Sequence, residues 1–145
     1  MTQPVAEGRV LGLDLGDVRI GVAICDDARR LAVPYGTIHT GAPADLQAIA
    51  ALIEELDVVE VVVGHPRSLS GEAGPRAQKA EAFAEALRAG LPQRVPVSLQ
   101  DERLSTVEAT RALRESGTKG KKARLMVDRS AATVILQAFL DRSDP

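Results

Sequence analysis

The run Val58-Val-Glu-Val-Val-Val63 limits the fold of this chain more than any other segment. It is rich in β-branched residues, lacks the alternation of a half-exposed strand, and is followed by Gly64. A strand of this kind is covered on both faces, as in the interior of a sheet with helices above and below it. The sequence therefore predicts a layered α/β protein with this strand inside its sheet.

Two apolar runs near the N-terminus predict a β-hairpin. Arg9–Asp14 and Ile20–Cys25 each have the length of a strand, and a turn separates them. A third strand is expected within Leu31 to Thr40, where Pro34 implies an edge position or an irregular start.

Helical spacing of apolar residues begins at Pro43, a residue that suits a first helical turn. A second helix is expected from about Pro75 until Gly90 and Pro92 end it. The alternating residues Val95–Leu99 then predict a fifth strand.

The C-terminal third predicts two further helices. Ser105-Thr-Val-Glu108 matches a capping box, so a helix is expected to run to about Ser116. The segment Gly117–Lys122 holds two glycines and three lysines and predicts a mobile basic loop. The last helix is expected to start near Asp128, which falls on the same stripe as the apolar residues that follow it.

The order β-β-β-α-β-α-β-α-α predicts a mixed five-stranded sheet flanked by helices. With 145 residues, 45% of them hydrophobic, we expect a single domain over 1–145 with an ordered core at about 9–141. No apolar run is long enough for a membrane span, and no basic-then-apolar leader is seen. Cys25 cannot form an internal disulfide and is read as a small buried residue, so we expect a cytoplasmic protein.

Charge is unevenly distributed along the chain. The formal net charge is -2, which argues against binding a polyanion with the whole surface. Between Asp101 and Ser130, however, eight basic residues face five acidic ones, a local net charge of +3. Any polyanion is therefore expected to meet the C-terminal third.

Three acidic positions stand at the boundaries of expected elements: Asp14 ends the first strand, Asp101-Glu102 end the fifth, and Asp128 opens the last helix. If the two strands are neighbours, these carboxylates meet at one end of the sheet. Such a cluster is repulsive unless a cation binds. Oxygen ligands suit Mg²⁺ or Mn²⁺, and paired ions of this type support phosphodiester hydrolysis. Taken singly, each acid favours a turn-forming or capping role, whereas the spacing of all three fits the nuclease and the structural role about equally.

Four segments resemble the YqgF/RuvX family, in order and over residues 9 to 141. They are Leu13–Ala23, Val61–Pro66, Asp101–Ala109, and Lys121-Lys122 followed by Asp128. The resemblance implies an RNase H-like fold and a relation to the resolvases that cut Holliday junctions. It also implies a role as a nuclease that matures the 5′ end of pre-16S rRNA.

Carried over by position, the resemblance makes Asp14 the first-strand metal-binding aspartate and Asp128 the acid of the last helix. The middle ligand is either Glu102 or Asp101. We favour Glu102 because its longer side chain can reach across a strand end. Alternation alone would bury Asp101 and expose Glu102, which shares a strand face with Gln100.

His65 departs from the family pattern, which usually has leucine at this position. The favoured interpretation is a surface loop histidine. The alternative is a phosphate contact or proton donor near the cleft.

Six basic residues are predicted to contact phosphates. Arg19 and Arg103 lie in the two most specific motifs, and a flexible approach to the cleft is formed by Lys119, Lys121, Lys122 and Arg124. For the lysines, solubility alone is the other interpretation. With no tryptophan, one tyrosine and two phenylalanines, stacking platforms for bases are nearly absent, which favours recognition of a duplex or junction backbone.

Two other functions fit parts of the sequence. In a catalytically inactive nucleic-acid-binding scaffold, the acids would be remnants and the basic segment would supply affinity. The segment Asp14–Val22 also resembles the first phosphate loop of actin-like and sugar-kinase ATPases, but 145 residues make only one of their two lobes. Symmetric cutting of a four-way junction would need two active sites and hence a homodimer, whereas an rRNA nuclease could act as a monomer.

Overall fold

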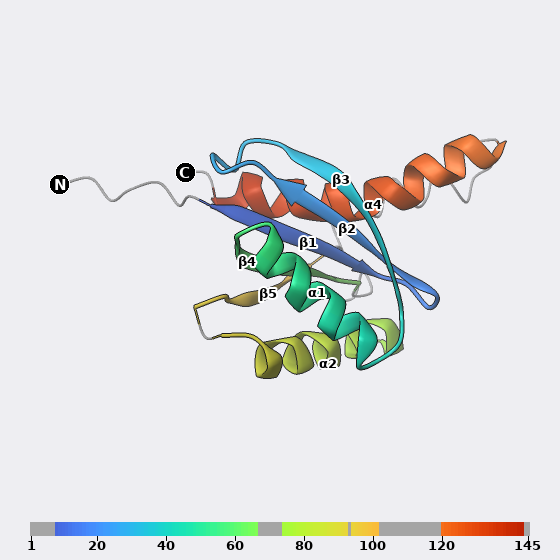
Figure 1. Ribbon diagram of the computed structural model, residues 1–145. Helices are drawn as coiled ribbons and strands as arrows, with labels where there is room; N and C mark the ends of the chain where they lie inside the picture. Colours follow the sequence, from blue (N-terminus) through green and yellow to red (C-terminus); the bar gives the residue numbers. More distant parts are fainter. Residues whose placement is uncertain (1–7, 67–73, 93, 102–119, 144–145) are drawn as a thin grey trace.

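The computed structural model describes residues 8–66, 74–92, 94–101 and 120–143, with the backbone alone for 120–130 and 143. Five strands and three helices lie in these ranges (Figure 1). They are β1 (Arg9–Leu15), β2 (Arg19–Cys25), β3 (Ala32–His39), α1 (Ala44–Glu55), β4 (Val58–His65), α2 (Pro75–Gly90), β5 (Val97–Asp101) and α4 (Gly120–Ser143). The predicted mixed five-stranded sheet is confirmed.

The strands are arranged in the order β3-β2-β1-β4-β5. β1, β2 and β3 pair antiparallel, so the predicted hairpin is confirmed, whereas β4 is parallel to both β1 and β5. The run that begins at Val58 is therefore an interior strand, as predicted. Because β1, β4 and β5 run in the same direction, their carboxyl ends meet at one edge of the sheet.

Helices cover both faces of this sheet. α1 and α2 lie on one face and α4 lies on the other (Figure 1). The core on the α1/α2 face includes Leu11, Leu13, Ile20, Val22, Ile49, Ile53, Val61, Val63, Ala80, Ala84 and Leu87. The core on the α4 face is built from Val10, Ala23, Cys25, Ala32, Val62, Ala132, Leu136 and Leu140.

Gly12 determines how closely α4 packs on β1. A Cβ atom at this position would lie 2.8 Å from Leu136 Cβ and 3.2 Å from the Ala132 carbonyl oxygen. The 2.8 Å separation is too short for two carbon atoms, so any side chain at this position would push α4 away from the strand.

The start of α4 differs from the sequence prediction. The helix begins at Gly120, eight residues before Asp128, so the predicted loop is wrong for Gly120–Lys122. Lysine, alanine, arginine, leucine and methionine are all good helix formers, and they fill this segment without any apolar periodicity. In Figure 1 this part of α4 extends past the strands. Because it does not pack on the sheet, it needs no apolar stripe, and the sequence shows none. The helix predicted over 105–116 lies outside the described residues.

Gln100 shows that both faces of β5 are covered. Its side chain is 5% exposed, and its Oε1 accepts a hydrogen bond from Arg142 Nη1 of α4 at 2.9 Å. The expectation that alternation exposes the Gln100 face of this strand is wrong, because α4 reaches that face.

Cys25 is buried, as its interpretation as a small apolar residue requires, with 3% of its surface exposed. The backbone N–H of Val10 donates to its Sγ at 3.1 Å. Burial raises the pKa of the thiol above its usual value. No helix among the described residues is long and apolar enough to cross a membrane.

Candidate active site

Asp14 lies near the carboxyl end of β1, where it is opposite Gly21 of β2. Side chains alternate along a strand, so Asp14 shares the α4 side of the sheet with Val10 and Gly12. The residue is partly buried and is one of those that line a cavity at this edge of the sheet. The strand-end position predicted for Asp14 is confirmed.

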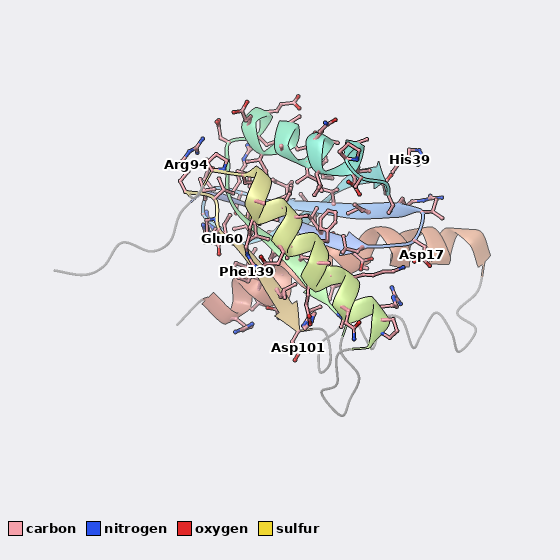
Figure 2. All side chains as sticks on the ribbon, turned by 90° about the horizontal axis from the view of Figure 1, so that it is seen from below. Asp17, His39, Glu60, Arg94, Asp101 and Phe139 are labelled. Carbon is pink, nitrogen blue, oxygen red and sulfur yellow. The ribbon has the colours of Figure 1, made fainter. Side chains whose placement is uncertain are left out.

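Asp101 reaches the same edge but lies on the other face. It is the register partner of His65, two residues beyond the pairing of Val63 with Leu99. Val63 belongs to the core under α1 and α2, and His65 contacts Glu81 of α2. Asp101 is therefore on the α2 side of the sheet, opposite to Asp14. Figure 2 shows it at the end of β5.

Asp128 is placed by its backbone alone. It lies one helical turn before Ala132, whose carbonyl oxygen is next to Gly12 of β1. α4 runs in the opposite direction to β1 (Figure 1). Four residues back along α4 cover about 6 Å, and two residues forward along β1 cover roughly 6.6 Å in the same direction. The position of Asp128 on α4 therefore lies alongside that of Asp14 on β1.

The cavity beside Asp14 has a volume of about 550 Å³. It lies where the β1–β2 turn, the end of β3, the start of α1, the end of β4 and the first half of α2 meet. Its walls are formed by Asp14, Leu15, Gly16, Asp17, Ile20, Thr40, Asp45, Gly64, Pro66, Arg76, Lys79, Ala80 and Phe83. A concave site of this size next to a strand-end carboxylate is a typical place for a ligand.

Among the predicted phosphate contacts, only Arg19 has a described side chain. It is exposed at the start of β2, opposite His39 of β3. The backbone positions of Lys121, Lys122 and Arg124 lie at the start of α4. Two further residues, Arg103 and Lys119, lie outside the described residues, as does Glu102.

Sequence reasoning missed the basic residues of α2. Arg76 and Lys79 line the cavity, and Lys79 Nζ is 3.8 Å from Asp17 Oδ1 across its rim. Both partners of this ion pair are mostly exposed, so it contributes little to stability. Arg76 and Lys79 are three residues apart on a helix, a spacing that places them on one face. This spacing in the sequence could have indicated a pair of basic residues on one face of α2.

Asp45 was also missed. It is 4% exposed, and both of its carboxylate oxygens accept backbone N–H groups, from Gly41 at 3.0 Å and from Leu46 at 2.7 Å. An acid in the first turn of a helix was the signal in the sequence. Its burial in a cavity wall follows only from the packing of α1 against the sheet.

His65 is not in a surface loop. It is the last residue of β4, is 9% exposed, and has its Nε2 atom 2.7 Å from Glu81 Oε2. The interpretation as a surface histidine is therefore wrong. Strand β4 continues for two residues beyond Val63, so it includes His65.

No three histidine, cysteine, aspartate or glutamate side chains form a metal-binding cluster within the described part of the chain. Of the three predicted ligands, only Asp14 has a described side chain.

Comparison with known proteins places this chain in a family. Residues 8–142 match the RuvX family, described as Holliday junction resolvase. A Streptomyces avermitilis protein named "Putative pre-16S rRNA nuclease" is 48% identical over 135 residues, which cover 92% of this chain and 86% of that protein. A Streptomyces coelicolor protein of the same name is 47% identical over 135 residues, 92% of this chain and 80% of that one.

A solved structure shares the fold. RuvC from T. thermophilus, in complex with a Holliday junction substrate, matches with a TM-score of 0.50 at 15% identity, covering 94% of this chain and 96% of that chain. The RNase H-like fold expected from the sequence is thereby confirmed. The chain belongs to the RuvX family of Holliday junction resolvases, a family of nucleases that hydrolyse phosphodiester bonds.

Proposed function

We propose that this chain is a metal-dependent endonuclease for structured nucleic acid, and that its active centre lies on the α4 side of the sheet at Asp14. One observation carries the proposal: Asp14 stands at the carboxyl end of β1, in the wall of the 550 Å³ cavity, alongside the α4 position of Asp128. A partly buried carboxylate in a concave site is suited to bind a cation.

Asp14, Glu102 and Asp128 are the proposed ligands. An all-oxygen donor set of carboxylates fits Mg²⁺ or Mn²⁺. When bound, such an ion supplies charge stabilisation for a phosphodiester and lowers the pKa of a coordinated water. The role of the protein is to orient these carboxylates, and the close approach of α4 to Gly12 fixes the distance between the β1 and α4 contributions.

For the middle ligand, the faces of the sheet favour Glu102 over Asp101. Asp101 lies on the α2 side, and the sheet itself separates it from Asp14. We therefore propose that Asp101 has no direct contact with the metal.

Arg19, Arg103, Lys119, Lys121, Lys122 and Arg124 are proposed to bind backbone phosphates. Arg19 is exposed at the same edge of the sheet as Asp14, since the β1–β2 turn joins the two strands there. The lysines at the start of α4 belong to a helix that extends past the sheet (Figure 1), where a long nucleic acid can reach them.

The substrate is either pre-16S rRNA, which the names of the relatives contain and which we expect to be cut at its 5′ end, or a four-way DNA junction, as in the family description. Both require the same phosphodiester hydrolysis. A junction cut symmetrically would require a homodimer, because each protomer carries one such centre. An RNA substrate sets no such requirement.

The test is a cleavage assay on both substrates with Mg²⁺, with Mn²⁺ and with a chelator. We expect cleavage only with metal, and Asp14→Asn and Asp128→Asn to lower its rate by a factor on the order of 10² or more. Asp101→Asn is the matched control and should cleave at nearly the wild-type rate. Equal rates for wild type and folded Asp14→Asn would refute the proposal and favour a nucleic-acid-binding scaffold.

A further inference from the structure

The cavity beside Asp14 extends beyond what metal binding needs. Asp14 lies at one side of it, while most of its wall is formed on the α1/α2 side of the sheet. A metal ion with its waters occupies only a small part of about 550 Å³. The remaining space is within the size range of sites for small organic groups.

The interior of this space is largely apolar. Leu15, Ile20 and Phe83 line it, together with Ala80 and Pro66. Phe83 is partly buried and packs against the core of the α1/α2 face, so its ring is held in place. It is one of only two phenylalanines in the chain, and a fixed aromatic ring of this kind can stack on a flat heterocycle.

Charge in the cavity excludes a phosphate from its interior. Asp45 is the buried acid of the wall, and its carboxylate would repel a phosphate placed beside it, whereas Asp17 is exposed at the rim and paired with Lys79. The two basic wall residues, Arg76 and Lys79, are exposed on the first turns of α2. The wall thus suits a neutral, planar group inside and phosphates at the α2 rim.

Asp45 adds a polar contact to this interior. It is almost fully buried, and each of its oxygens accepts one backbone N–H group. A carboxylate has about four acceptor sites, so it retains capacity for a further donor. Amino groups on nucleobases are donors that carboxylates accept well, whereas an unpaired uracil or thymine has no amino group and offers only its ring N3–H.

We propose that this cavity takes up one unstacked nucleobase of the substrate, and that Arg76 and Lys79 bind the phosphates that flank it. The base stacks on Phe83 and donates from an amino group to Asp45. The inference rests on the proposed function in one respect: the base belongs to a nucleotide next to the phosphodiester that lies at Asp14. Unstacking a base costs least where strands are unpaired or branched. A site for an unstacked base therefore favours structured substrates over a regular duplex.

The test uses 2-aminopurine, a base whose fluorescence rises when it leaves its stack. It is placed at successive positions of a four-way DNA junction and of an RNA with the 5′ end of a 16S precursor. The full chain is added with a chelator, so that no cutting occurs. We expect a rise at one position near the cut site in the substrate that the enzyme cleaves.

Two variants examine the cavity independently. Phe83→Ala should abolish the fluorescence rise and weaken binding roughly 5- to 100-fold. The double change Arg76→Ala with Lys79→Ala involves exposed residues only, so folding is retained. It should weaken binding about tenfold and lower the slope of log affinity against log salt by about 1 to 2.

The matched control replaces two exposed arginines remote from the cavity, Arg30→Ala with Arg94→Ala. Figure 2 shows Arg94 on the opposite side of the molecule from Asp17 and the start of α2. This control should keep the fluorescence rise.

Base preference gives a further check. Uracil or thymine at the responding position should weaken binding about tenfold, and Asp45→Asn should reduce that difference. If no position responds, or if both cavity variants keep the rise, the proposal is wrong. The outcome is separate from that of the proposed function, because Asp14→Asn should lose cleavage and keep the rise.

Discussion

The two faces of the sheet differ in what their side chains do. On the α1/α2 face, large apolar residues such as Leu11, Leu13 and Ile49 are fully buried and form the main core. On the α4 face, β1 carries Gly12 and Asp14, and α4 contributes Ala132 against the strand. The first face holds most of the large apolar core, whereas the second combines a smaller core with the close approach of α4 to β1 at Gly12 and with Asp14. The largest losses of stability are therefore expected from mutations on the α1/α2 face, and the largest losses of cleavage rate from mutations on the α4 face.

The largest expected effect separates the two acids at the edge of the sheet. Asp14→Asn should lower metal-dependent cleavage by a factor on the order of 10² or more, because a ligand on the α4 side is lost. Asp101→Asn, on the α2 side, should stay within a few-fold of wild type. Cleavage rates of both variants, with circular dichroism as the folding control, measure this difference. If Asp101→Asn lost more cleavage activity than Asp14→Asn, the active centre would lie on the α2 side of the sheet instead.

A mutation in the core under α1 should lower stability and leave the cleavage rate nearly unchanged. Ile49 is completely buried, so Ile49→Ala should lower the free energy of unfolding by about 2 to 5 kcal/mol through lost burial and a cavity. At temperatures where the variant remains folded, its cleavage rate should be close to wild type. Urea unfolding followed by circular dichroism checks the first statement. A stable variant with lost activity would contradict the division between the faces.

Gly12→Ala should lower both the stability of the fold and the cleavage rate. The added Cβ must displace Leu136 or the backbone at Ala132, at a cost of about 1 to 3 kcal/mol. Moving α4 also moves the backbone of Asp128 relative to Asp14, so the cleavage rate should fall more than the stability loss explains. Gly36→Ala is the matched control, since nothing lies within 4 Å of a Cβ atom there. Equal activity of the two variants would show that the fit of α4 on β1 does not matter for catalysis.

His65→Leu should have a small effect. Its Nε2 pairs with Glu81 on the α2 side, and the Glu81 side chain is 45% exposed, so stability should change by about 1 kcal/mol or less. Cleavage should be unchanged. A marked loss of cleavage in a folded His65→Leu variant would instead support the role as phosphate contact or proton donor.

The smallest effect concerns Cys25 at alkaline pH. Because burial raises the pKa of this thiol, the folded state holds its proton more tightly than the unfolded state does. Its contribution to stability is complete below the unfolded pKa, about 8.5, and falls as the pH rises above it. Urea unfolding at pH 7 and pH 9.5 should show this decline in wild type and a smaller one in Cys25→Ala. The same decline in both would assign it to other groups.

The sequence predicts the elements of the sheet well because each signal is local. The β-branched run from Val58 and the apolar runs before Asp14 and Cys25 show strands directly. The start of α4 was mispredicted because good helix formers without apolar periodicity do not look like a packed helix. His65 and Gln100 were assigned to exposed positions because their burial depends on α2 and α4, which lie far away in the sequence.

The candidate site was predictable only in part. Motif resemblance identifies Asp14 and Asp128, but it leaves Asp101 and Glu102 undecided, and strand register is needed to place Asp101 on the α2 side. The cavity was not predictable, since its wall combines the β1–β2 turn with the first half of α2. These segments lie more than fifty residues apart and meet only because β4 lies next to β1.

The central claim is that a divalent cation binds on the α4 side of the sheet through Asp14. Titration with Mn²⁺, followed by electron paramagnetic resonance of the free ion, measures this binding without any nucleic acid. We predict that wild type and Asp101→Asn bind Mn²⁺ with similar affinity and that Asp14→Asn binds it at least about tenfold more weakly. Unchanged binding in Asp14→Asn, or a loss confined to Asp101→Asn, would contradict the account.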